Sequence, residues 1–362
     1  MGCQTFNITV IGAGVAGLTT AYVLSQNPNF KITVVAKYMP GDYHAEYASP
    51  WAGANFWPMG EAGSEQAAFE KATWPQLFKL ANERPESGIA FQKSYIHTRT
   101  EDVGKAGSLF ASNDGNLPWW SSLFPDFKSL DSSELAPGIH STFEFTTVCI
   151  NTAIYLPWLL SQGLGNGVAF KRAVVEHVAD ATSLHENPEH AQVIVNCTGL
   201  MARKLGGVDD TSVVPARGQV VVVRNDPEIM TTASNATSEH NTMAYMMCRP
   251  GGGGTILGGC YQVDNWNEFP DPDVAEIIKK GCVALYPALT QGKGADELSV
   301  IRHGVGFRPL RPQGVRVATE YIKGIPVVHN YGHGGWGYQS SYGCASAVAS
   351  LVEREAKIGA KL

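Results

Sequence analysis

Basic charge is scarce in this sequence, and no basic stripe runs through it. The 362 residues include 27 lysines and arginines against 33 aspartates and glutamates, giving a formal net charge of −6. Nucleic-acid binding draws on basic residues that release counterions from phosphates, so a nucleic-acid partner is not expected. Apolar residues make up 44% of the chain and charged residues 17%, a balance that excludes a disordered protein and predicts a packed core.

Paired cysteines are also missing. The seven cysteines are scattered without a C-x-x-C pair, and their number is odd. That pattern is typical of a reduced intracellular chain and excludes a disulfide framework or a zinc module. No metal site is predicted, because His329 and His333 have no third ligand at metal spacing and are explained equally well as structural residues.

The features of a secretory signal or a membrane span are absent. The stretch 6–24 is fairly apolar, but no basic residue precedes it, and three glycines and three threonines interrupt it. We therefore expect a soluble protein without a membrane partner. The last three residues, Ala360-Lys361-Leu362, differ at one position from the Ser-Lys-Leu address that a peroxisomal import receptor reads, although three residues also match by chance.

Glycine is what the sequence has in excess, with 39 residues gathered in short clusters. One cluster follows the apolar run 8–11 and precedes an apolar-periodic stretch and a second apolar run, 32–36. This order predicts a strand, a glycine turn, a helix and a strand, the setting in which the fingerprint G-x-G-x-x-G binds a dinucleotide. The helix N-terminus would then face the pyrophosphate, with the contacts made by Gly12, Ala13, Gly14, Val15, Ala16 and Gly17.

One position departs from the dinucleotide pattern. An Asp or Glu is expected near the end of the second strand, where it holds the adenosine ribose. This sequence offers Lys37 and Tyr38 there, and Asp42 lies too far along the chain. Binding is therefore expected to depend more on backbone groups.

Further along, the pattern predicts helices over 65–83, 155–164 and 343–356, and strands over 143–150, 169–178, 193–199 and 219–224, of which 193–199 ends in a small-residue turn. Apart from its one helix, the segment 56–141 has an irregular pattern rich in Trp, Pro and Ser. Dinucleotide-type features lie at both ends and in the middle of the chain. The binding domain is therefore expected to be discontinuous, with substrate-facing segments inserted.

Two tyrosines are candidates for the site because of a predicted hairpin. The β-compatible runs 242–248 and 255–262 flank Arg249, Pro250 and four glycines. With the turn centred on Gly253, Tyr245 lies opposite Tyr261 on one face of the sheet. Two adjacent phenols can bind a carboxylate, but a cross-strand tyrosine pair on the surface has the same pattern.

A carboxylate clamp and a ring site are predicted near the C-terminal end. Among the arginines of 301–317, Arg308 lies between Phe307 and Pro309 in a glycine-punctuated segment, which favours a half-buried guanidinium over an exposed one. The glycine-rich run 329–340 then opens the terminal helix, whose N-terminus stabilises negative charge. A reduced flavin carries such charge and a nicotinamide does not, so this feature favours FAD.

Several segments together are similar to one family, the D-amino-acid oxidases, and most closely to its fungal and yeast members. They occur in family order along nearly the whole chain: 10–18, 49–55, 196–200, 217–219, 306–309 and 329–332. The resemblance implies an α/β (mixed α+β) fold, with a Rossmann-type FAD-binding domain over 1–55, 143–205 and 300–362. It implies an inserted mixed-sheet domain for substrate binding and oligomerisation over 56–142 and 206–299. Since the family is often dimeric, a homodimer is expected.

The resemblance also implies an activity and its residues. The expected reaction is oxidative deamination of a D-amino acid, with hydride passing from the α-carbon to flavin N5 and dioxygen becoming hydrogen peroxide in the peroxisome matrix. Arg308 would bind the substrate carboxylate with help from Tyr245 and Tyr261, and the Gly335 carbonyl would accept from the amine. Beyond the glycine turn, the implied cofactor contacts are Lys37, Ser49, Ala52, Gly53, Asn55, Val174, Val175, Thr198, Gly199, Gly334, Gly335, Gly337, Tyr338 and Gln339.

Three alternatives remain at this point, and one of them, a catalytically silent FAD-binding protein, is disfavoured by the presence of Arg308 and both tyrosines. A D-aspartate oxidase shares these motifs but needs a second cationic or donor group, for which Arg249 or His333 is a candidate. An NAD-dependent dehydrogenase is compatible with the first glycine turn alone.

Overall fold

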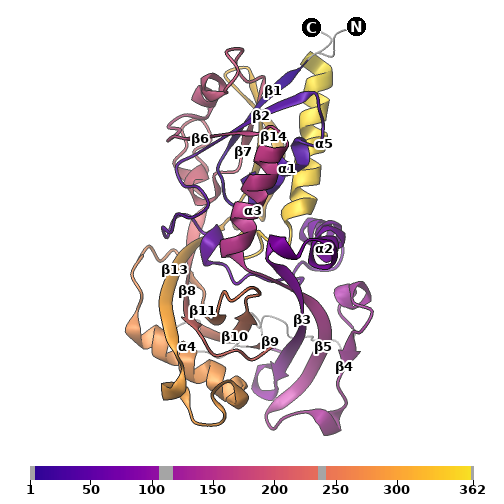
Figure 1. Ribbon diagram of the computed structural model, residues 1–362, viewed down its shortest axis with the longest axis vertical. Coiled ribbons are helices and arrows are strands. Elements are labelled where there is room, and N and C mark those ends of the chain that lie inside the picture. Colours follow the sequence, from indigo (N-terminus) through magenta and orange to yellow (C-terminus); the bar gives the residue numbers. More distant parts are fainter. Residues whose placement is uncertain (1–4, 106–116, 235–241, 360–362) are drawn as a thin grey trace.

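The computed structural model describes residues 5–105, 117–234 and 242–359. The predicted peroxisomal address, Ala360-Lys361-Leu362, lies outside them. Two mixed sheets, one above the other in Figure 1, organise the described chain, and five α-helices pack against them, so the predicted α/β (mixed α+β) class is confirmed. No helix of the described residues is both long and apolar enough to cross a membrane.

The first sheet has six strands in the order β14-β15-β7-β1-β2-β6. All neighbours pair in parallel except β14 and β15. The central strand β1 is buried along its whole length, as expected for a parallel strand covered on both faces. The strands are β1 (Phe6–Ile11), β2 (Phe30–Ala36), β6 (Ala169–Arg172), β7 (Val193–Asn196), β14 (Arg316–Ile322) and β15 (Ile325–Tyr331).

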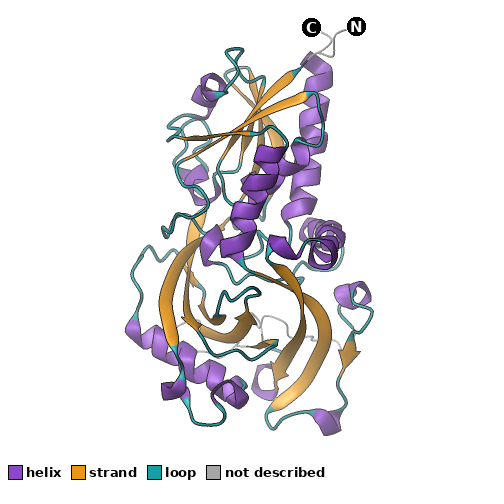
Figure 2. Ribbon diagram, in the orientation of Figure 1, coloured by secondary structure: helices purple, strands orange, loops and turns teal. Residues whose placement is uncertain are grey.

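The second sheet has nine strands in the order β12-β8-β11-β10-β9-β3-β5-β4, with β13 also paired to β8. Its pairs are antiparallel except that of β3 with β9. Figure 2 shows the strong curvature of these strands below the first sheet. The strands are β3 (Ile89–Arg99), β4 (Lys128–Ser129), β5 (Ile139–Ile150), β8 (Val214–Val223), β9 (Met230–Ala233), β10 (Thr242–Cys248), β11 (Thr255–Cys260), β12 (Gln262–Val263) and β13 (Val300–Leu310).

The α-helices divide between the two sheets. Helices α1 (Val15–Leu24), α3 (Thr152–Gly165) and α5 (Ser341–Gly359) lie together against the six-stranded sheet, whereas α4 (Pro272–Leu285) covers β8, β10 and β11. Helix α2 (Glu65–Glu83) packs against both α5 and β3. Helix α2 therefore joins the two layers close to the place where they meet.

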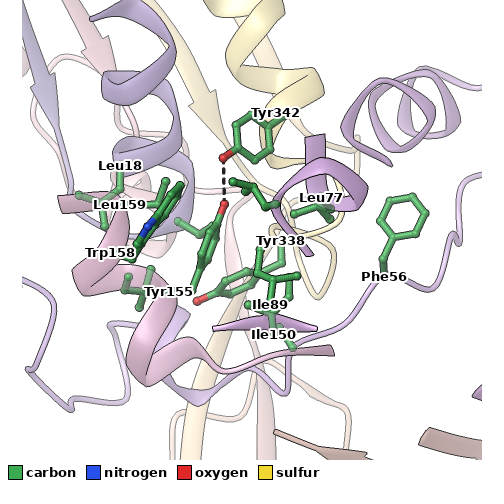
Figure 3. Packing of buried hydrophobic residues seen from close by; sticks show 14 of the residues in the cluster. Leu18, Phe56, Leu77, Ile89, Ile150, Tyr155, Trp158, Leu159, Tyr338 and Tyr342 are labelled. Atoms are coloured by element: carbon green, nitrogen blue, oxygen red, sulfur yellow. Dashed lines mark hydrogen bonds between the residues drawn. The ribbon is translucent and has the colours of Figure 1, made fainter. Parts of the chain in front are cut away.

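An aromatic cluster fills the core where α3 and α5 approach each other. Figure 3 shows Tyr155, Trp158, Tyr338 and Tyr342 packed among leucines and isoleucines, and the Tyr155 and Tyr342 hydroxyls are hydrogen-bonded at 3.2 Å. All four rings are less than 7% exposed. Because such rings bury a large apolar area, the cluster fixes the start of α5, and with it the glycine-rich run that precedes this helix.

The structure confirms most predicted elements and corrects three of them. The segment 56–141 contains the eleven-residue strand β3, which the sequence analysis missed because its first half alternates poorly and its partner β5 is distant in sequence. Strand β6 ends at Arg172, so Val174 and Val175 follow it in a loop. In the hairpin, Tyr245 lies opposite Gly258 and not opposite Tyr261.

The division into two domains stays a prediction. The ranges 143–205 and 300–362 were predicted to belong to the FAD-binding domain. They include most of β5 and all of β13, and both strands hydrogen-bond into the nine-stranded sheet.

Candidate active site and cofactor cavity

One large cavity lies between the two sheets, with residues of both in its walls. Its empty space is about 1450 Å³ including the opening to solvent. It has two ends. The glycine end is formed by Gly14, Val15 and Ala16 of the glycine turn together with Ser49, and the arginine end is formed by Arg308, Tyr245 and Tyr261.

The glycine end depends on close backbone approach. Gly12 has φ +107°, and its N–H donates to the Val35 carbonyl at 2.8 Å. A Cβ at Gly12 would lie 2.5 Å from the Cys197 carbonyl oxygen, and one at Gly17 would collide with the Gly12 carbonyl. The turn is therefore held against both neighbouring strands, which brings the start of α1 to the cavity.

The first turn of α1 offers backbone donors to the cavity. Gly14 is its N-cap and has no side-chain capping bond, while the Val15 N–H donates to Ser49 Oγ at 3.0 Å. The Tyr47 hydroxyl donates to the Ala13 carbonyl at 2.7 Å, which fastens the following loop over the turn. Free N–H groups and the positive end of a helix dipole suit a phosphate or pyrophosphate group.

Arg249 holds the loop that forms the middle of the cavity. It is only 4% exposed, its Nε donates to the Gly53 carbonyl at 2.6 Å, and its Nη2 donates to the Ala52 carbonyl at 2.6 Å. Burial lowers the pKa of Arg249 to about 10. Because its Nε and Nη2 donate to these carbonyls and it does not line the cavity, Arg249 is not available as a second substrate cation.

Three polar atoms of residues that line the cavity are buried without a partner among the described residues. They are Asn55 Nδ2, Asn330 Oδ1 and His333 Nε2. Burial lowers the pKa of His333 to about 4, so its ring is neutral at physiological pH. Buried polar groups of this kind usually have a hydrogen-bond partner, and a polar ring in the cavity would supply one.

Arg308 on β13 dominates the arginine end. Its Nη1 donates to the Cys260 carbonyl at 3.0 Å, and its guanidinium carbon lies 5.3 Å from the centre of the Tyr261 ring. No carboxylate of the described residues forms an ion pair with it, in contrast to Arg311, which binds Asp210 at 3.0 Å. Gly218 on β8 lies under the guanidinium, since a Cβ there would collide with Arg308 Nη1.

Both predicted tyrosines reach this end, but not through the predicted register. Tyr245 lies on β10 with its ring over Gly258, where a Cβ would collide with the phenol, and Tyr261 follows β11. Both line the cavity beside Arg308. Burial raises the pKa of both phenols, against a smaller opposite effect of the Arg308 charge. Both hydroxyls therefore stay protonated at neutral pH.

The glycine-rich run before α5 closes the cavity. Gly334 has φ +55° and Gly335 is exposed to the cavity, while the Tyr338 hydroxyl donates to the Ser49 carbonyl at 2.9 Å. The Gln339 amide donates to Glu70 Oε1 at 2.7 Å and accepts from the Trp57 N–H at 3.3 Å. Glu70 is fully buried on α2, and its role in holding Gln339 had no signal in the sequence.

The cavity collects most of the predicted site residues. Those that line it are Gly14, Val15, Ala16, Ser49, Ala52, Gly53, Asn55, Gly199, Tyr245, Tyr261, Arg308, Gly334, Gly335, Gly337, Tyr338 and Gln339. Those that do not are Gly12, Ala13, Gly17, Lys37, Val174, Val175 and Thr198. Lining residues that were not predicted as site residues include Gly218 and Met247, because each comes from a strand whose partner is distant in sequence.

Comparisons with known proteins agree along the whole chain. The family model described as FAD dependent oxidoreductase matches residues 7–351. A D-amino-acid oxidase of Fusarium vanettenii is 49% identical over 97% of both chains, and one of Schizosaccharomyces pombe is 37% identical over 94% of both. A D-aspartate oxidase of Talaromyces thermophilus is 28% identical. Among solved structures, glycine oxidase of Bacillus cereus has a TM-score of 0.73 at 16% identity, covering 97% of this chain and 98% of that one, which shows a shared fold.

Proposed function

Because this chain belongs to the FAD dependent oxidoreductase family, we propose that its cavity binds FAD and oxidises D-amino acids with dioxygen. The oxidation gives an imino acid and hydrogen peroxide, and water then hydrolyses the imino acid to a 2-oxo acid and ammonia. The observation that carries the proposal is that Arg308, which has no carboxylate partner among the described residues, lines the same cavity as a dinucleotide-type glycine turn. The family match over nearly the full length displaces the NAD-dependent dehydrogenase alternative.

The cavity fits FAD on several observations. The helix N-terminus at Gly14, Val15 and Ala16 suits the pyrophosphate, and the unpartnered Asn55 and His333 atoms suit a polar ring. The other cofactor contacts implied by the family resemblance, of which Lys37 is the first in the sequence and Gln339 the last, stay proposals for FAD. FAD, when bound, supplies a two-electron acceptor for the α-hydrogen of the substrate.

The chain's own residues orient the substrate. The Arg308 guanidinium binds its carboxylate, because that fork matches two carboxylate oxygens and no carboxylate of the described residues competes for it. The protonated Tyr245 and Tyr261 hydroxyls donate to the same group. The Gly335 carbonyl accepts from the amine, and the two attachments together determine which enantiomer turns its α-hydrogen toward the ring.

Orientation and charge placement supply the rate enhancement. Since the α-hydrogen leaves with both bonding electrons, no general base is required at the α-carbon. The residues then contribute by holding the reacting atoms close and by keeping the site partly closed to water.

The cavity favours neutral side chains over the acidic side chain of D-aspartate. Within the described residues, the only charged side chain in its wall is Arg308, since His333 is neutral and Arg249 is bound to loop carbonyls. The apolar lining of the cavity includes Trp57, Met243 and Met247. A second carboxylate there would be desolvated without a charge partner.

Two properties outside the cavity belong to the same proposal. The C-terminal tripeptide would direct the enzyme to the peroxisome, a compartment suited to an enzyme that forms hydrogen peroxide. A homodimer is proposed from the family resemblance.

The test is an assay of peroxide formation by the purified, FAD-loaded chain. We expect turnover with D-alanine, far less with D-aspartate, and none with L-alanine. Turnover mainly with D-aspartate would assign the alternative activity. A chain that acquires no flavin absorbance when FAD is supplied would refute the proposal.

A further inference from the structure

The end of strand β2 lacks the acidic residue that a dinucleotide site normally places there, yet the structure brings a carboxylate to the side chains of the two residues that follow this strand. Gly12 N–H donates to the Val35 carbonyl, so the end of β2 lies beside the glycine turn. Lys37 and Tyr38 follow β2 directly. The carboxylate comes from Glu46, nine residues after Lys37, and its Oε2 accepts from Lys37 Nζ at 3.2 Å and from the Tyr38 hydroxyl at 3.1 Å.

The loop that carries Glu46 is fastened over the glycine turn by its next residues. The Tyr47 hydroxyl donates to the Ala13 carbonyl, and Ser49 Oγ accepts from the Val15 N–H. The Tyr38 ring also stacks on Tyr47, with centroids 5.9 Å apart. Glu46 therefore lies near the end of β2 in a loop whose position is held by these hydrogen bonds and by the ring stacking.

One oxygen of the Glu46 carboxylate is available to accept a hydrogen bond from a ligand. All its contacts with the described residues end on Oε2, including a longer one to His44 at 3.9 Å, so Oε1 is open to a ligand. The Glu46 side chain is 20% exposed, which lets a ligand reach it. Burial alone would raise the pKa of Glu46, but the Lys37 ammonium and the Tyr38 hydroxyl lower it below its usual value, so the group is ionised at neutral pH.

Asp42, the other acidic side chain of this loop, does not have an open oxygen. Its Oδ2 accepts from Arg172 Nη1 and from the Met39 N–H, and its Oδ1 accepts from Arg172 Nη2 at 3.3 Å. The same Arg172 donates to the Lys37 carbonyl at 3.1 Å. Asp42 thus braces the loop and leaves Glu46 as its available acceptor.

We propose that Glu46, held by Lys37 and Tyr38, binds a hydroxyl of the adenosine ribose of FAD in place of the missing acidic residue of β2. An ionised carboxylate is the acceptor that ribose hydroxyls meet in dinucleotide sites. Lys37 then acts as a positioning residue that orients the carboxylate. This inference rests on the proposed FAD function.

The test measures FAD binding to the full-length apoprotein by the quenching of flavin fluorescence. Two ligands are compared, FAD and an FAD analogue whose adenosine ribose lacks its 2′- and 3′-hydroxyls. Wild type is expected to bind the analogue about tenfold more weakly than FAD, the loss of a charge-assisted hydrogen bond. Glu46→Leu is expected to bind FAD about tenfold more weakly and to show no preference, and Glu46→Gln to lie between, while Asp42→Asn keeps the wild-type preference.

The outcomes separate this inference from the proposed function. If wild type binds FAD but the Glu46 variants keep the preference for hydroxyls, or lose affinity for both ligands equally, the assignment of Glu46 is wrong and the FAD site stands. If wild type does not quench FAD fluorescence at all, the proposed function falls, and this inference falls with it.

Discussion

At the glycine end of the cavity, the groups that face a ligand are backbone atoms of one short segment that the strand–turn–helix order fixes locally. At the arginine end they are the side chains of Arg308, Tyr245 and Tyr261, which strands β13, β10 and β11 bring together from distant positions. The first end tolerates no added Cβ at Gly12 or Gly17, whereas the second depends on particular functional groups. The difference predicts that changes at the glycine end affect cofactor affinity, and that changes at the arginine end affect turnover while the cofactor stays bound.

The largest effect is expected at the arginine end. Arg308→Met removes the cation that we propose holds the substrate carboxylate, and it should lower kcat/KM for D-alanine about a thousandfold, or about 4 kcal/mol. The FAD dissociation constant should stay within about twofold of wild type. The control is Arg224→Met. Arg224 is exposed and directly follows strand β8, and its substitution should leave both quantities unchanged. A loss of FAD together with turnover would contradict the separation of the two ends.

At the glycine end, Gly12→Ala should weaken FAD binding about a hundredfold. Its Cβ would lie 2.5 Å from the Cys197 carbonyl oxygen, and its φ of +107° is unfavourable for alanine. Gly41→Ala is the matched control, since Gly41 has φ +101° but nothing within 4 Å of its added Cβ. Fluorescence titration with FAD measures both variants. Equal losses in the two would show that backbone strain, and not the close approach, is responsible.

Two glycines beside Arg308 allow a finer test. Gly218→Ala places a Cβ against the guanidinium and should raise KM for D-alanine at least about tenfold, because the fork must move away from its carboxylate-binding position. At Gly335 an added Cβ meets Arg308 Cδ at 3.5 Å, an ordinary contact, so Gly335→Ala should change KM less than about threefold. Steady-state kinetics with saturating FAD compares them. Similar effects in both variants would mean that Gly218 does not position Arg308.

The smallest expected effect is that of the phenols. Tyr245→Phe and Tyr261→Phe each remove one donor and should lower kcat/KM about three- to tenfold. Burial raises the pKa of both hydroxyls, so they remain protonated donors as pH rises from ~7 to ~9, and the ratio of wild-type to variant activity should stay constant over that range. A ratio that falls toward one across this range would indicate that a phenol ionises near neutrality.

The same contrast explains what could be predicted from sequence. The turn at Gly12–Gly17 and helix α1 are local, so their pattern was sufficient, and the C-terminal glycine run was found for the same reason. Tyr245 was expected in the site through a wrong register, because the register shift between Thr242 and Tyr245 leaves no mark in the sequence. Glu70 and Arg249 were not recognised as residues that support the site, because their partners are distant in sequence. Glu70 binds Gln339, more than two hundred residues away, and Arg249 binds Gly53, nearly two hundred residues away.

The central claim is that Arg308 holds the substrate carboxylate while the rest of the cavity holds the ring. The test is the anaerobic reduction of the FAD-loaded enzyme, monitored by the loss of flavin absorbance. Two substrates are compared, D-alanine and D-alaninamide, which lacks the carboxylate. Wild type should prefer D-alanine by about a hundredfold or more, and Arg308→Met should lose that preference because it no longer has the charge that distinguishes the two. A variant that reduces slowly but keeps the wild-type preference would contradict the claim.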